Sequence, residues 1–82
     1  MTQEQQEQQE QKEHLEQQLQ WTVEQVRILD EMDVKLHEMK RIAEYALAHN
    51  LSAIEIERLN GELETLKTEF SSLERQLYPI LH

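Results

Sequence analysis

Histidine is the side chain that titrates nearest to neutral pH, so the four histidines are the first candidates for chemistry. His37-Glu38 begins like the HExxH helix of zinc sites, but Arg41 stands where the second histidine is required. Asp33 lies one helical turn before His37 and could share a metal with it, yet two ligands are too few for a protein site. The pattern favours a solvated row of ion pairs, and we expect no metal site.

Other catalytic arrangements lack a partner residue. Acid–base catalysis needs carboxylates held in a cleft, which a chain of two helices does not offer. The sequence contains no cysteine nucleophile, and its single glycine cannot build a phosphate-binding loop. We therefore expect a protein without enzymatic activity and without a cofactor.

Composition narrows the fold class. The chain has 82 residues, with one glycine and one proline, so a turn-rich sandwich, barrel or enzyme domain is excluded and an all-α fold is expected. The net charge of −9 argues against nucleic acid and anionic membranes as partners. No apolar run reaches the roughly 18 residues of a membrane span, and the first residues do not resemble a secretory signal peptide.

Residues 1–20 form a Glu/Gln-rich, low-complexity extension, and residues 21–82 form the predicted hairpin domain. Glutamate falls at every third position of the extension, a spacing that creates no apolar helix face. A solvated, fraying helix and a disordered tail are both compatible with this composition, as is a Gln-rich contact segment.

The first helix is predicted over about residues 3–49. Apolar residues at heptad spacing predict an interaction seam on it. The seam consists of Leu29, Met32, Leu36, Met39 and Ala43. Flanking positions are also partly apolar, so this helix is expected to touch two or more others. Trp21, Ile28 and Ile42 lie on one flank as possible partner anchors, although for Trp21 a place at the end of the core is favoured over an exposed anchor.

The second helix is predicted over about residues 52–78, where apolar residues alternate in steps of three and four. This seam consists of Ile56, Leu59, Leu63, Leu66, Phe70, Leu73 and Leu77. Gly61 falls on the outward face, and Tyr78-Pro79 is expected to end the helix because proline disfavours a helical residue before it.

A short connection is predicted between the helices. His49-Asn50 can end the first helix, and Ser52 with Glu55 forms a capping box for the second. A connection this short makes the helices antiparallel neighbours. The hairpin is small, so we expect it to complete a coiled coil or four-helix bundle by oligomerisation, with a homodimer favoured.

The stretch 29–46 resembles the N-terminal helical region of bacterial flagellins. Its apolar positions are held by Leu36, Met39, Ile42, Ala43 and Ala46, and Lys40 stands where the family usually has its second arginine. Asn50-Leu51-Ser52 is similar to the family's loop, and residues 59–70 to its next helix. The resemblance covers about residues 20–75, and the Glu/Gln-rich extension stands in place of the family's N-terminal filament segment.

The resemblance implies a hairpin that needs a further helix. The leading expectation is a flagellin-like structural or accessory protein of bacterial origin that self-associates or docks onto other helices. The alternative is a small acidic helical chaperone or regulator that binds amphipathic helices of a partner, such as a flagellar export substrate. The corresponding location is the cytoplasm, or the flagellum after export without a signal peptide.

Overall fold

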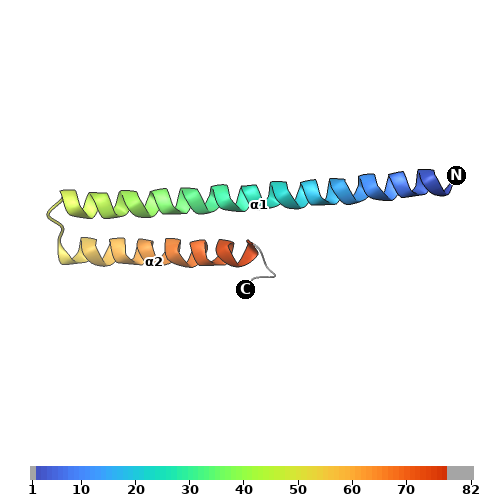
Figure 1. The fold of residues 1–82 in the computed structure, drawn as a ribbon. Helices are drawn as coiled ribbons and strands as arrows, with labels where there is room; N and C mark the ends of the chain where they lie inside the picture. The colour runs from blue at the N-terminus through green and yellow to red at the C-terminus, as the bar shows by residue number, and fades with distance from the viewer. Residues whose placement is uncertain (1, 78–82) are drawn as a thin grey trace.

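The computed structural model describes residues 2–77, which form two α-helices and a short connection. The helices are α1 (Gln3–Ala48) and α2 (Ala53–Gln76), and they run antiparallel, side by side (Figure 1). The predicted all-α helical hairpin is thus confirmed. α1 begins where it was predicted to begin, and the other three boundaries lie one or two residues inside the predicted ones. The predicted stop at Tyr78-Pro79 lies outside the described residues.

Both helices begin with a side-chain cap. Thr2 and Gln5 form a reciprocal capping box at the start of α1, with the Gln5 N–H donating to Thr2 Oγ1 (3.3 Å) and the Thr2 N–H donating to Gln5 Oε1 (3.1 Å). At the start of α2, Ser52 Oγ accepts from the Glu55 N–H (3.2 Å) and donates to Glu55 Oε1 (3.3 Å). These caps satisfy backbone donors that the first helical turn leaves open.

The connection reverses the chain within a few residues. His49 leaves the helix in an extended conformation (φ −123°, ψ 147°). Its Nδ1 lies 2.9 Å from the Tyr45 carbonyl oxygen, and its ring stacks on the Tyr45 ring at 4.0 Å between centroids. The histidine side chain therefore covers the C-terminal end of α1, where carbonyls lack helical partners.

The two helices differ in length, and this difference sets the shape of the molecule. α1 has 46 residues and α2 has 24, so α1 extends well beyond α2 (Figure 1). We call residues 3–24 the N-terminal arm, and every residue in it is exposed. The molecule measures 74 × 21 × 15 Å, and its radius of gyration of 21.4 Å exceeds the about 12 Å of a compact domain of this length.

The core lies between the helices and is thin. Its buried residues are Ile28, Met32, Leu59, Leu66 and Leu77. Phe70 and Leu73 pack against the cluster that contains Ile28 and Leu77, at the end of α2. One interface between two helices is all that the described chain buries, which fits a hairpin of low intrinsic stability.

Candidate helix-docking surfaces

The face of α1 that meets α2 is a heptad row that we call the inner seam. It consists of Gln25, Ile28, Met32, Lys35, Met39 and Ile42, all buried or half-buried. On α2, Leu59, Leu63, Leu66, Phe70, Leu73 and Leu77 are buried or half-buried, whereas Ile56 stays 47% exposed. The predicted α2 seam therefore faces α1, apart from its first residue.

An ion pair crosses this interface. Lys35 occupies an inner-seam position, and its Nζ lies 2.6 Å from Glu69 Oε2 on α2. The hydrogen bond to Glu69 raises the pKa of Lys35 above its ordinary value, while partial desolvation opposes that rise. Gln25 is also buried, and every buried side-chain nitrogen or oxygen in residues 2–77 has a hydrogen-bond partner.

The structure corrects the predicted arrangement of α1. Leu29, Leu36 and Ala43 do not face α2, and Leu29 and Leu36 remain 44% and 49% exposed. Ile28 is only 2% exposed and so is not a surface anchor, and Ile42 is half-buried. The physical reason is that α1 has adjacent apolar heptad positions and α2 can cover only some of them. Trp21 lies in the N-terminal arm and is 51% exposed.

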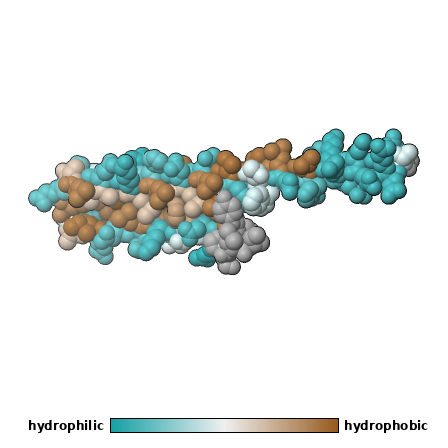
Figure 2. All heavy atoms as spheres, viewed as in Figure 1, coloured by the Kyte–Doolittle hydropathy of each residue, from teal (hydrophilic) through white to brown (hydrophobic). Residues whose placement is uncertain are grey.

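A second heptad row lies one residue further along α1, and we call it the outer seam. It consists of Leu15, Leu19, Thr22, Val26, Leu29, Asp33, Leu36, Lys40, Ala43 and Leu47. All of these residues are exposed. Because each residue turns an α-helix by about 100°, this row faces sideways from the inner seam. It runs from the arm into the hairpin, and Figure 2 shows apolar side chains continuing from the hairpin onto the adjoining part of the arm.

The regular spacing of the outer seam was present in the sequence as steps of four and three from Leu15 to Leu47. Sequence reasoning divided this row between the predicted seam, which included Leu29, Leu36 and Ala43, and one flank, which Asp33 and Lys40 interrupt. The capping box of Thr2 and Gln5 was also missed, although a threonine followed three residues later by glutamine is its sequence pattern.

The other side of the hairpin carries a groove of about 870 Å³ between the helices. Its walls are Glu38, Arg41 and Ile42 from α1 and Arg58, Gly61, Glu62, Thr65 and Leu66 from α2. Gly61 leaves this wall open, since a Cβ placed there would meet nothing within 4 Å. The groove has an apolar floor and charged rims of both signs.

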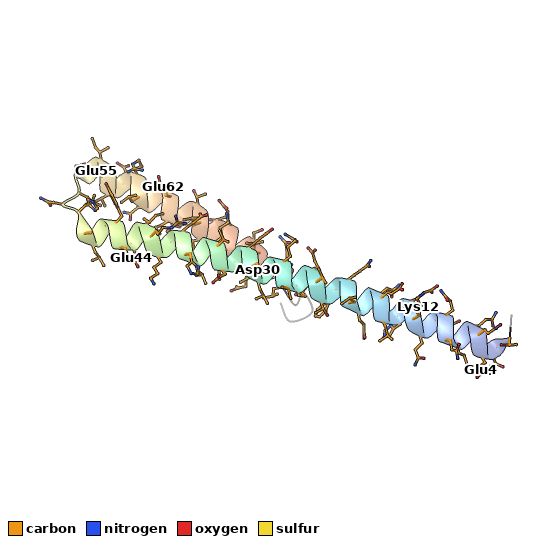
Figure 3. The ribbon with its side chains drawn as sticks, turned by 90° about the horizontal axis from the view of Figure 1, so that it is seen from above. Glu4, Lys12, Asp30, Glu44, Glu55 and Glu62 are labelled. Carbon is orange, nitrogen blue, oxygen red and sulfur yellow. The ribbon has the colours of Figure 1, made fainter. Side chains whose placement is uncertain are left out.

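Ion pairs lie on exposed faces of the hairpin, and acidic side chains are spread along both helices (Figure 3). Arg27 bridges Glu24 and Glu31 on α1, and its hydrogen bond lowers the pKa of Glu24. Arg58 pairs with Glu62 at 2.9 Å on α2. Exposed pairs within one helix contribute little to stability, and they keep these faces solvated.

The structure also shows the positions of His37 and Asp33, which the sequence suggested as possible metal ligands. His37 Nδ1 lies 2.8 Å from the Asp33 carbonyl oxygen and 3.5 Å from its carboxylate, an arrangement within one helix. Within residues 2–77 no group of three or more metal-binding side chains comes together. Over the same range, neither helix has a stretch long and apolar enough to cross a bilayer.

The fold and its surfaces define a helical hairpin with an extended arm. No protein-family model, curated protein or solved structure matches the chain.

Proposed function

We propose that this chain is a non-enzymatic protein that works by associating with helices, and that the outer seam is its main contact surface. The observation that carries the proposal is a row of large apolar side chains left in water. The side chains of this row that are between 44% and 64% exposed are Leu15, Leu19, Val26, Leu29 and Leu36. An apolar row of this length on a helix is typical of a surface that packs against another helix.

The surface area of the chain supports the same proposal. Its accessible surface is 6935 Å². A compact monomer of this mass would expose about 5,200 Å². The excess is the surface of an elongated molecule with one thin interface, and association would cover part of it. Binding to a second chain would also stabilise the hairpin by mass action.

Self-association, with a homodimer favoured, is the simplest form of this function. The resemblance of residues 20–75 to flagellins adds the proposal that the chain is a structural or accessory protein of that kind. What supports this addition is the apolar pattern around Leu36, Met39 and Ile42, together with the loop at Asn50-Leu51-Ser52.

Sedimentation equilibrium of the wild-type chain tests self-association. We expect the average mass to rise with concentration. A double variant, Leu29→Glu with Leu36→Glu, should remain monomeric while keeping its helical circular dichroism, because both changes lie outside the α1–α2 interface. Val34→Glu is the matched control, since Val34 is equally exposed (53%) but lies off both seams, and it should associate like the wild type. A wild-type chain that stays monomeric would contradict the proposal.

The alternative function is that of a small chaperone or regulator for amphipathic helices, and the groove beside Gly61 is the observation that favours it. Its volume and apolar floor suit a partner side chain or helix edge. Titration with peptides from flagellin terminal helices tests this alternative. Binding that is lost in Gly61→Trp, which would fill the groove, would support it, whereas binding lost only in the Leu29/Leu36 double variant would place partner docking on the outer seam.

A further inference from the structure

We infer that the outer seam pairs with the outer seam of a second copy in an antiparallel arrangement, centred between Val26 and Leu29. This inference rests on the proposed self-association and adds the partner, its direction and its register. In this register Val26 lies opposite the partner's Leu29, and Leu19 lies opposite the partner's Leu36. Thr22 lies opposite the partner's Asp33, and Leu15 lies opposite the partner's Lys40.

The charges within the outer seam select the antiparallel direction. A parallel, in-register pair would place Asp33 against the partner's Asp33 and Lys40 against the partner's Lys40. Like charges in facing core positions of a coiled coil are destabilising. The antiparallel arrangement avoids both contacts, because Asp33 and Lys40 both lie C-terminal to the centre of the pairing between Val26 and Leu29.

The order of side chains along the seam selects the register. In the register given above, leucine and valine side chains face leucine side chains of the partner, and the small polar Thr22 faces the partner's Asp33. Lys40 can lay its aliphatic stem on the partner's Leu15 while its ammonium group stays near Glu44, 3.8 Å away in the hairpin. A shift of one heptad in one direction places the partner's Asp33 against Leu29, and a shift in the other direction places it against Leu15.

The lengths of the helices fit the same arrangement. α2 has 24 residues and lies beside the part of α1 that follows the arm (Figure 1). The arm, residues 3–24, is nearly as long as α2. A two-fold axis near residues 27–28 of α1 places the partner's α2 at the level of about residues 7–30 of the first chain. The two copies of α2 then follow one another along the dimer and overlap only near the axis. Each arm gains the partner's α1 as a neighbour over the stretch that contains Leu15 and Leu19.

Disulfide cross-linking tests this register. Because the sequence contains no native cysteine, only the introduced cysteines can form a disulfide. The full-length chain with Leu19→Cys is mixed with the full-length chain with Leu36→Cys and oxidised. A disulfide requires Cα atoms within about 7 Å. We expect a covalent dimer in the mixture and none from either variant alone, because each site lies about 25 Å from its own copy along the partner helix. Leu15→Cys mixed with Lys40→Cys is a second, independent pair with the same expectation.

Val34→Cys mixed with Leu36→Cys is the control for random collision and should give no covalent dimer. Cross-linking of Leu19→Cys with itself would overturn the antiparallel direction, and cross-linking of Leu36→Cys with itself would overturn the register. A wild-type chain that is dimeric by sedimentation, with neither mixture cross-linking, would overturn this register while leaving self-association in place. A monomeric wild type would overturn both.

Discussion

Lys35 shows how one charged residue can take part in an apolar interface. Its position on the inner seam lies between Met32 and Met39, and its ammonium group reaches Glu69 on α2. A long aliphatic stem can cover apolar surface while the charge stays near water. The contact joins the two helices, unlike the other ion pairs of the described chain, which lie within one helix.

The raised pKa of Lys35 leads to a prediction about alkaline pH. A raised folded-state pKa adds stability that is fully present below the ordinary lysine value of about 10.4 and is lost as pH rises through the folded value. Glu69→Gln removes the cause of the shift, so its urea midpoint should fall less steeply than that of the wild type above pH 10. Glu64→Gln, on the same helix and exposed, is the control. Equal alkaline losses in wild type and Glu69→Gln would contradict this role.

Replacement of Gly61 is predicted to raise the stability of the hairpin. Gly61 lies within α2 in the wall of the groove, and an added Cβ meets open space. Alanine is better than glycine in a helix interior by about 1 kcal/mol. Gly61→Ala should therefore stabilise the hairpin by about that amount in urea unfolding followed by circular dichroism. A destabilised variant would show that the glycine has a packing role which the structure does not contain.

At the scale of the elements, the α1–α2 interface supplies the cooperativity of the hairpin. Leu66 is 8% exposed on α2, and truncating a buried leucine costs about 2–5 kcal/mol. A core this small rarely provides more than about 3–5 kcal/mol, so Leu66→Ala should remove most or all of the thermal transition.

Ile54→Ala is the matched control for this prediction, because Ile54 lies on the same helix but is 79% exposed. Its free energy of unfolding should change by less than about 0.5 kcal/mol. A Leu66→Ala chain that melts like the wild type would show that the helices do not depend on each other.

The existence of both helices and their connection could be predicted because the determinants are local. Steps of three and four between Leu59 and Leu77 and a serine cap at Ser52 act within a few residues. The pairing face of α1 could not be predicted in the same way. α1 offers the inner and outer seams one residue apart, and the choice between them depends on contacts across the interface, such as Lys35 with Glu69.

The candidate docking surface was accordingly predicted only in part. Leu29 and Leu36 were recognised as seam residues, but they belong to the outer seam and not to the interface with α2. Ile28 was recognised as apolar, and its burial against α2 depends on the fold. Sequence patterns therefore identify which apolar residues are suited to burial, while tertiary packing determines which helix buries each of them.

At the scale of the whole molecule, the N-terminal arm is the feature that most needs explanation. It is a stretch of α1 with about 33 Å of length beyond α2. Glu and Gln are good helix formers, but most helical stability in proteins comes from tertiary packing, and the arm has no neighbouring helix within the described chain. Packing against another chain would supply the tertiary contacts that stabilise a helix. The apolar side chains of Leu15 and Leu19 mark where that packing would begin.

Hydrogen exchange of the arm, followed as a function of protein concentration, tests the central claim most directly. Amides of residues 10–24 should exchange rapidly in dilute solution and slow down as the average mass rises, while amides of the α1–α2 hairpin stay protected throughout. If the arm exchanges at one rapid rate at every concentration while the hairpin remains protected, association through the outer seam of α1 is contradicted.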